Sequence, residues 1–291
     1  MNDSMYQQIQ EQRSDMSHGK GHFHEINAKN ETAETLHFYH ATGFPFGSYA
    51  DLLGRLSEDC NIFGLAHRGC WEDQAEPESS VAWYNYADDL IEFLDKQKRG
   101  PVVGMGHSIG GVTTMFAAIK RPDLFSKIVL IDPVFVAPPL WYMSRLARLI
   151  NKPVPMAAVA KKRPNHWGSR EEAVEFHRGK RAFSRFTDVS MEAYGHFGIK
   201  ETDKGFGLRF SRDWEAHIYS SVPYIWRQLP KLKLPVLGLR GEYSDVLMDK
   251  SWNRWKKLRP QDQLISLSEC GHMLPHERPL ECAEHIREFL K

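Results

Sequence analysis

The chain has 291 residues, of which 42% are hydrophobic and 26% charged, enough for one large α/β domain with an insertion. Its 38 Lys and Arg against 37 Asp and Glu leave a net charge of +1, so composition favours neither nucleic acid nor an anionic membrane as partner. The N-terminal segment lacks the apolar core of a signal peptide, and no run approaches the roughly 20 apolar residues of a membrane span. We therefore expect a cytoplasmic protein that acts on a small molecule, as a monomer or small homo-oligomer.

The first part of the chain predicts alternating strands and helices. Residues 1–19 are polar and lack apolar periodicity, which predicts a loosely ordered N-terminal arm or a helix packed late on the surface. Short β-rich runs and helical spacing of apolar residues then alternate. The strands are expected at residues 22–26, 35–40, 61–66, 102–103 and 127–131, and the helices at 49–56, 84–94 and 112–119. This alternation predicts a parallel sheet covered by helices on both faces, with ligands at the carboxyl ends of the strands.

The rhythm changes after residue 131. Prolines at 133, 138 and 139 open a segment with apolar helical patches at 140–150 and a capping-box pattern at Ser169 to Glu172, which predicts a helical cap over 133–230. Strands at 234–239 and 263–267 and helices at 248–258 and 279–290 complete the fold. The expected domains are the arm 1–19, a core of 20–132 and 231–291, and the cap 133–230.

Two features have ordinary interpretations. Residues 161–185 hold eight Lys or Arg against three Glu, which we interpret as a solvated helix face; the alternative is a site for an anionic substrate or partner. The four cysteines show no C-x-x-C spacing, which favours free thiols over a disulfide framework or a metal site. We expect no metal and no cofactor.

The strongest motif is G-x-S-x-G at residues 106–110, set between an apolar strand and an apolar helix. A strand that reverses directly into a helix strains its turn residue, and side chains at the flanking Gly106 and Gly110 would collide there. The turn raises the hydroxyl of Ser108 beside the N–H groups of a helix start, which favour a developing oxyanion. The motif predicts Ser108 as a nucleophile.

A serine nucleophile needs a base and an acid that orients it. His272, in a loop between the last strand and the last helix, is the best placed of 14 histidines to be the base. For the carboxylate that fixes its tautomer we select Asp245, because its loop follows the strand nearest in sequence to the His272 loop. Asp132, directly after another strand, is the second candidate, with a cap-hinge role as its other interpretation, and Glu242 is the third.

The oxyanion needs two backbone donors. We expect one to be the N–H of Ile109 and the other that of Phe44, with Gly43 as the alternative. The side chains expected to contact substrate are Phe44, His107, Phe135, Trp141 and Met273. Aromatic residues of the cap also have the simpler interpretation of cap core.

With these residues in this order, the chain resembles a serine hydrolase of the α/β-hydrolase superfamily. The resemblance covers residues from about 21 to 291 and rests on four motifs in order: His-Ala-Thr-Gly-Phe-Pro at 40–45, Gly-His-Ser-Ile-Gly-Gly at 106–111, Arg-Gly-Glu-Tyr-Ser-Asp at 240–245 and Gly-His-Met at 271–273. It implies a mostly parallel eight-stranded sheet with a cap inserted after the sixth strand, and the chain order serine, aspartate, histidine. The first motif is longer than the common His-Gly-x-Pro form, which leaves the second oxyanion donor between Gly43 and Phe44.

The segments 167–171 and 178–180 resemble members described broadly as carboxylesterases or lipases. We therefore expect a carboxylic-ester hydrolase acting through an acyl-enzyme on small to medium groups. The alternatives on the same triad are a C–C bond hydrolase, an amidase or an acyltransferase. A non-catalytic ligand-binding protein, or a protein that binds an anionic partner through residues 161–185, is the alternative of a different class.

Overall fold

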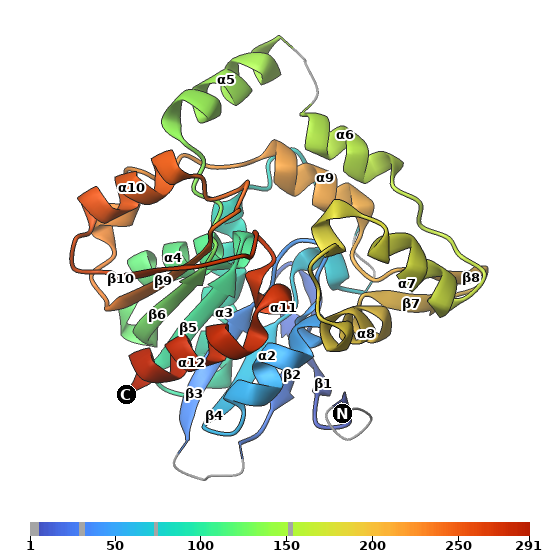
Figure 1. Ribbon diagram of the computed structural model, residues 1–291, viewed down its shortest axis with the longest axis horizontal. Coiled ribbons are helices and arrows are strands. Elements are labelled where there is room, and N and C mark those ends of the chain that lie inside the picture. The colour runs from blue at the N-terminus through green and yellow to red at the C-terminus, as the bar shows by residue number, and fades with distance from the viewer. Residues whose placement is uncertain (1–5, 29–32, 73–74, 151–153) are drawn as a thin grey trace.

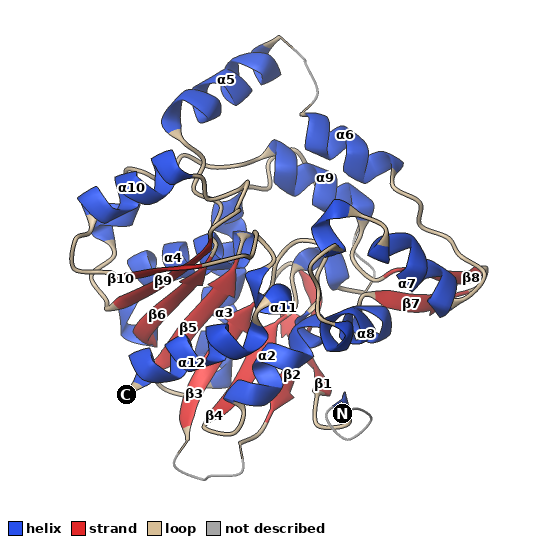
Figure 2. Ribbon diagram, in the orientation of Figure 1, coloured by secondary structure: helices blue, strands red, loops and turns tan. Residues whose placement is uncertain are grey.

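The computed structural model describes residues 6–28, 33–72, 75–150 and 154–291, and is built around one eight-stranded sheet (Figure 1, Figure 2). The sheet order is β1-β2-β4-β3-β5-β6-β9-β10. The six strands from β4 to β10 pair in parallel, while β2 is antiparallel to both of its neighbours. The strands are β1 (Gln10–Met16), β2 (Gly19–Ile26), β3 (Glu34–Tyr39), β4 (Cys60–Leu65), β5 (Val102–His107), β6 (Phe125–Ile131), β9 (Val236–Gly241) and β10 (Gln263–Leu267). The predicted mostly parallel α/β sheet is confirmed.

Helices cover both faces of this sheet. The long helices of the core are α2 (Ala50–Leu56), α3 (Trp83–Gln97), α4 (Ile109–Lys120), α10 (Asp249–Leu258) and α12 (Pro279–Leu290). Their apolar stripes form two clusters, one joining α3, α4 and α10 to the sheet and the other joining α2 and α12 to its opposite face. Burial on both faces explains why the central strands read as continuous apolar runs in the sequence.

The N-terminal arm differs from its prediction. Residues 10–16 form β1, an edge strand that pairs along its whole length with β2. Most of its side chains are exposed, so the strand carries no alternation of apolar and polar residues that a sequence pattern could detect. Main-chain pairing with β2 holds this segment in the sheet. The first five residues of the arm lie outside the described residues.

Residues 133–230, which we call the insert, run between β6 and β9 above the carboxyl ends of the strands (Figure 1). They form α5 (Pro138–Leu149), α6 (Pro155–Lys162), α7 (Arg170–Arg178), α8 (Asp188–Phe197) and α9 (Arg212–Ser220), together with the two-stranded sheet of β7 (Ile199–Thr202) and β8 (Gly205–Leu208). The small sheet was not predicted; its strands have four residues each, too short for a periodic signal. The insert itself follows the sixth strand as expected.

The predicted cap of α7 is present with one change. Ser169 accepts the N–H of Glu172 at 3.1 Å, as an N-cap residue does. The carboxylate of Glu172 bonds to the N–H of Gly168 at 2.7 Å instead of returning to Ser169. The start of the helix is therefore satisfied one residue further upstream than in the standard capping box.

Acidic partners lie beside much of the basic segment 161–185. Arg163 pairs with Glu215 at 3.0 Å and Arg178 with Asp188 at 3.2 Å, while Arg181 pairs with Asp245. These pairs offset part of the positive charge of the segment.

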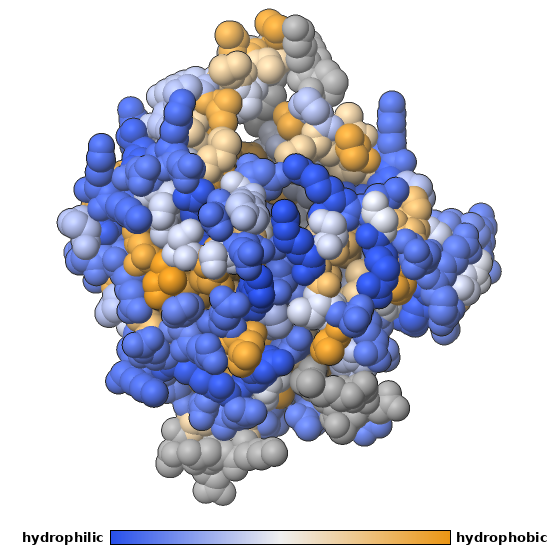
Figure 3. Space-filling view, in the orientation of Figure 1, coloured by the Kyte–Doolittle hydropathy of each residue, from blue (hydrophilic) through white to orange (hydrophobic). Residues whose placement is uncertain are grey.

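The exposed apolar side chains of the insert gather on α5, on the residue that follows it and on α6, at the top of Figure 3. They are Leu140, Tyr142, Met143, Leu146, Ile150, Met156 and Val159. Among the described residues, no helix has both the length and the apolar character needed to span a membrane. All four cysteines are buried free thiols, as predicted.

Candidate active site

Ser108 sits at a strained turn between β5 and α4. Its backbone angles, φ of 58° and ψ of −120°, lie outside the regions that residues other than glycine usually adopt. A Cβ at Gly106 would come within 2.3 Å of the backbone of Gly110, and a Cβ at Gly110 within 2.0 Å of the carbonyl oxygen of Tyr39. The predicted need for glycine at both positions is confirmed.

His272 lies between Ser108 and an aspartate. It follows β10 in the loop before α11 (Leu274–Glu277), and its Nε2 is 3.1 Å from the Oγ of Ser108. Its Nδ1 is 3.1 Å from Oδ1 of Asp132. A carboxylate only accepts hydrogen bonds, so Nδ1 carries the proton and Nε2 presents its lone pair to the serine hydroxyl. The structure therefore brings the predicted nucleophile and base together in the orientation that proton transfer needs.

Asp132 follows β6 directly and its side chain is fully buried. Besides the His272 ring, its carboxylate accepts the hydroxyl of Ser244 at 2.6 Å and the N–H of Gly241 at 3.0 Å. Three donors thus surround this fully buried carboxylate and fix its direction.

The prediction that Asp245 is the partner of His272 is wrong. The Asp245 side chain is 55% exposed and pairs with Arg181 of the insert. Its loop does reach the site, but through Ser244, whose hydroxyl bonds to Asp132. Glu242, the third candidate, accepts the N–H of Glu269 at 3.0 Å instead. Because β6 and β9 are neighbours, loops after both strands meet at one edge, and strand order alone could not separate the two aspartates.

The positions of Asp132 and Asp245 within their loops are the sequence feature that distinguishes them. Asp132 is the first residue after its strand, whereas Asp245 stands four residues beyond Gly241, where β9 ends. A residue directly after a strand stays at the sheet edge, while a longer turn carries its side chain out to solvent.

The predicted oxyanion donors fare differently. Ile109 is the first residue of α4, where backbone N–H groups have no acceptor within the helix, and it lines the cavity beside Ser108. The N–H of Phe44 instead donates to the carbonyl of Ala41 at 3.2 Å. The structure contradicts Phe44 as a donor because its N–H closes a turn. Gly43 supplies the left-handed residue of that turn, with φ of 79°.

Buried His40 holds this turn in place. Its Nε2 accepts the N–H of His67 at 2.9 Å, so its Nδ1 carries the proton and donates to the carbonyl of Ala41 at 2.8 Å. Burial lowers the pKa of His40 to about 4, which keeps the ring neutral. The carbonyl of Ala41 therefore receives two donors, the His40 ring and the N–H of Phe44.

His107 does not line the cavity, against its prediction as a substrate contact. Its fully buried ring donates from Nε2 to the carbonyl of His272 at 2.9 Å, so its Nδ1 accepts the hydroxyl of Tyr49 at 2.8 Å. The oxygen of Tyr49 accepts the N–H of Ala41 at 3.2 Å. Burial and the neighbouring His272 hold the pKa of His107 well below its ordinary value. One chain of hydrogen bonds thus joins the 40–45 loop, the His272 loop and the tight turn 106–110 that carries Ser108 between β5 and α4, which we call the elbow.

A cavity of about 530 Å³ lies against Ser108 and His272. Its apolar lining comes from both the core and the insert and includes Trp83, Ile109, Val134, Val136, Ile218, Val222, Met248 and Met273. Its charged lining consists of Arg181, Arg185, Asp245 and Glu277. The predicted contacts Phe44 and Met273 line this cavity.

Two other predicted contacts do not. Phe135 is fully buried in the core, with its ring 4.9 Å from that of Trp255. Trp141 donates its indole N–H to the carbonyl of Val222 at 3.0 Å and is not part of the cavity lining. Phe135 thus packs the base of the insert against the core, while Trp141 joins α5 to another segment of the insert, which agrees with the simpler interpretation of cap aromatics as cap core.

Comparisons with known proteins identify the family of the chain. The sequence pattern described as "Alpha/beta hydrolase family" matches residues 36–285, most of the chain. The chain therefore belongs to the α/β hydrolase family and is an enzyme of the hydrolase class.

Three similar proteins illustrate the family. The chain is 26% identical over 272 residues to "Uncharacterized hydrolase YugF" of Bacillus subtilis, covering 92% of this chain and 93% of that protein. It is 24% identical over 250 residues to "Monoglyceride lipase" of Rattus norvegicus, covering 82% and 75%. The solved structure of E-2-(acetamidomethylene)succinate hydrolase superposes with a TM-score of 0.82 at 20% identity, covering 97% of this chain and 99% of that one. This last likeness establishes the fold alone.

Proposed function

We propose that the chain hydrolyses carboxylic esters through Ser108 as nucleophile, His272 as general base and Asp132 as the residue that orients the base. The hydrogen-bonded series of these three side chains, with both distances at 3.1 Å, is the observation that carries the proposal. Each supplies what the reaction needs: a hydroxyl that lines the cavity from a strained turn, a free imidazole lone pair, and a buried carboxylate that fixes the tautomer.

In the first half of the reaction, the Oγ of Ser108 attacks the ester carbonyl while its proton passes to Nε2 of His272. Asp132 stabilises the imidazolium that forms and stays ionised. The tetrahedral oxyanion then collapses to the acyl-enzyme as His272 gives its proton to the leaving alkoxide. In the second half, His272 removes a proton from water, the resulting hydroxide attacks the acyl carbon, and Ser108 regains its proton.

We assign the oxyanion donors to the backbone N–H groups of Ile109 and Thr42. Thr42 lines the cavity together with Ser108 and Ile109, whereas the N–H of Phe44 is already bonded to Ala41. An N–H at this position would add a second fixed dipole opposite the helix start, which supports the charge that develops on the carbonyl oxygen.

The apolar lining of the cavity supports an ester with a small to medium apolar acyl or alcohol group. The likeness to a lipase supports the same class of bond. An amidase, a C–C bond hydrolase or an acyltransferase would use the same three side chains, so substrate assays must separate them.

The test is hydrolysis of p-nitrophenyl esters of graded acyl length, beside matched anilides and assays with added alcohol. We expect turnover of esters by the wild type, a loss of kcat of at least ~10³-fold in Ser108→Ala, and wild-type rates in Ser80→Ala, which alters an exposed serine. A fluorophosphonate probe should label the wild type and the Ser80→Ala control but not Ser108→Ala. Absence of both turnover and labelling in the wild type would refute the proposal, and preferred anilide cleavage would replace it with an amidase.

A further inference from the structure

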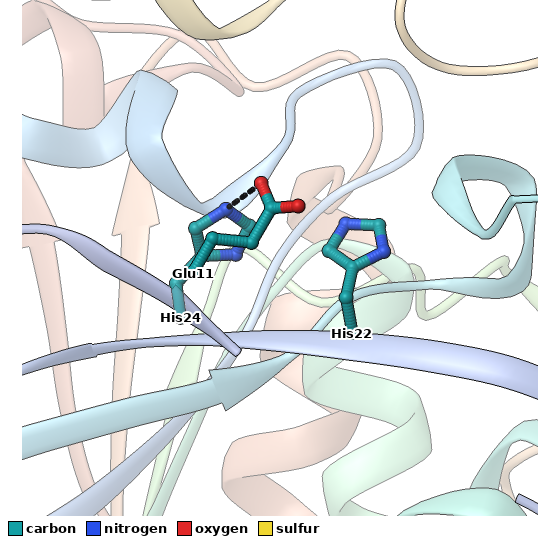
Figure 4. Close-up of side chains that lie close together, drawn as sticks. All are labelled: Glu11, His22 and His24. Atoms are coloured by element: carbon teal, nitrogen blue, oxygen red, sulfur yellow. Dashed lines mark ion pairs between the residues drawn. The ribbon is translucent and has the colours of Figure 1, made fainter. Parts of the chain in front are cut away.

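Two histidines and a glutamate come together on the β1–β2 hairpin, on strands that the proposed reaction does not use. His22 and His24 alternate along β2 and so point to the same face of the sheet. Glu11 of β1 stands directly opposite His24 in the antiparallel register. Figure 4 shows the carboxylate of Glu11 between the two imidazole rings.

The spacing of these groups suits a metal ion. Oε2 of Glu11 is 3.2 Å from Nε2 of His24, and one ligand atom from each of the three residues lies within 4.8 Å of the others. Zinc bonds of about 2.0–2.2 Å to nitrogen and oxygen in a tetrahedron place ligand atoms about 3.3 Å apart. The Glu11 and His24 atoms already have this spacing. The Glu11 side chain, 47% exposed, has room to bring its other oxygen toward His22.

The two imidazoles are buried with hydrogen-bonding capacity unused. His22 and His24 are 6% and 5% exposed. Within the described part of the chain Nε2 of His22 has no partner; Nε2 of His24 has Glu11 as its partner, and its Nδ1 is the nitrogen without one. Metal ions bind the neutral form of imidazole and the ionised form of a carboxylate, and the cluster offers two imidazoles and one carboxylate.

Two arginines, Arg13 and Arg209, lie near the cluster. Arg13 opposes His22 in the register, but its guanidinium is 3.2 Å from Glu72. Arg209 approaches Oε2 of Glu11 at 4.0 Å and is the cation that competes with a metal for this carboxylate. Its Nε also donates to the carbonyl of Phe197 at 3.1 Å, which holds the side chain at the edge of the cluster.

We propose that Glu11, His22 and His24 form a binding site for a divalent transition-metal ion of the zinc type, which fastens the edge strand β1 to β2. Imidazole nitrogen with one carboxylate is a donor set that suits Zn²⁺ and is too poor in oxygen for Mg²⁺ or Ca²⁺. The exposed side of Glu11 gives the ion a path of entry and leaves a coordination position to water. The expectation of no metal rested on cysteine spacing, which carries no information about this site; its sequence signal is the His-x-His pattern at residues 22–24.

The bound ion stabilises the folded chain, because it holds two strands that otherwise meet through main-chain bonds and few buried side chains. The site is independent of the proposed hydrolysis, since none of its residues contacts Ser108, His272 or Asp132. Among the described residues, this is the group of His, Cys, Asp or Glu side chains that meets the spacing for a metal ion.

The test is calorimetric titration of chelator-treated protein with Zn²⁺. We expect about one ion per chain, and Glu11→Gln, His22→Gln and His24→Gln each to weaken binding by more than the ~10- to 100-fold that loss of a supporting residue costs. His166→Gln, which alters an exposed histidine of the insert, should bind as the wild type does. Arg209→Gln should bind more tightly, because the competing cation is gone. Excess Mg²⁺ should leave the titration unchanged.

Thermal unfolding supplies a second measurement should the histidine variants fold poorly. Zn²⁺ should raise the Tm of the wild type and of His166→Gln, but not of Glu11→Gln, whose altered side chain is half exposed and leaves the core intact. Ester hydrolysis by Glu11→Gln should match the wild type with or without chelator, so the two proposals fail separately. Absence of Zn²⁺ binding by the wild type, or equal binding by Glu11→Gln, would overturn the metal site.

Discussion

Asp132 accepts the Nδ1 proton of His272 across 140 residues of sequence, and this one bond decides which nitrogen of the imidazole faces Ser108. An asparagine at 132 could turn its NH₂ group toward Nδ1 and favour the other tautomer, which puts a proton where the lone pair is needed. We expect Asp132→Asn to lower kcat by about 10⁴-fold, the cost of a wrong tautomer in serine proteases. Steady-state kinetics with the preferred p-nitrophenyl ester measures the effect.

Asp245→Asn is the matched control, because it removes a carboxylate from the neighbouring loop. Its side chain is half exposed and pairs with Arg181, so the variant should keep kcat within a few-fold of the wild type. An equal loss in both variants would contradict the assignment of Asp132.

Much of this site was predictable, for reasons that lie in particular residues. The elbow was predictable because no other residue fits at Gly106 and Gly110, and His272 was predictable because it follows the last strand. The acidic partner of His272 was not predictable, because two aspartates follow adjacent strands. They differ only in the length of the turn between the strand and the aspartate. The edge strand β1 was missed because its pairing is carried by the main chain, which composition does not record.

The second prediction concerns the glycines of the elbow. Gly110→Ala would press a Cβ to 2.0 Å from the carbonyl oxygen of Tyr39, a backbone atom that cannot step aside. We expect a loss of at least about 1–3 kcal/mol in the free energy of unfolding, measured by urea denaturation, together with loss of ester turnover. Gly179→Ala is the control, because the nearest atom to its Cβ is 3.8 Å away and its φ of −72° suits any residue. Equal stability of the two variants would mean that the elbow tolerates a side chain.

Tyr49 is the positioning residue of the third prediction. Tyr49→Phe leaves the N–H of Ala41 and the Nδ1 of His107 buried without a partner. We expect a cost of about 1–3 kcal/mol in stability and a lower kcat with little change in KM, since the hydroxyl aligns the reacting groups but lies behind the substrate cavity.

Tyr86→Phe provides the comparison for Tyr49. Tyr86 is equally buried, but within the described part of the chain its hydroxyl has no hydrogen-bond partner. Its removal should leave both stability and kcat near wild-type values. A KM effect in Tyr49→Phe larger than the kcat effect would point to substrate binding and against positioning.

Buried neutral histidines make stability depend on pH. Burial lowers the pKa of His37 and of His276 from 6.5 to about 3. Below pH 6.5 these histidines bind protons in the unfolded chain but stay neutral in the folded one. The free energy of unfolding therefore falls as pH drops from 6.5 toward the pKa of the folded state. Above pH 6.5 both states are neutral and these groups contribute no pH dependence. Each such histidine adds a slope of up to about 1.4 kcal/mol per pH unit.

His276→Phe isolates one of these rings. Neither nitrogen of His276 has a side-chain partner within the described residues, and the ring stacks on Phe186 at 4.6 Å, a setting that accepts an apolar aromatic. Denaturation at several values between about pH 7 and about pH 5 should show a shallower acid slope in the variant, by about the contribution of one proton. His285→Gln, on α12 and only partly buried, should keep the wild-type slope. A slope unchanged in His276→Phe would mean that this ring is protonated in the folded protein, and that burial does not exclude its charge.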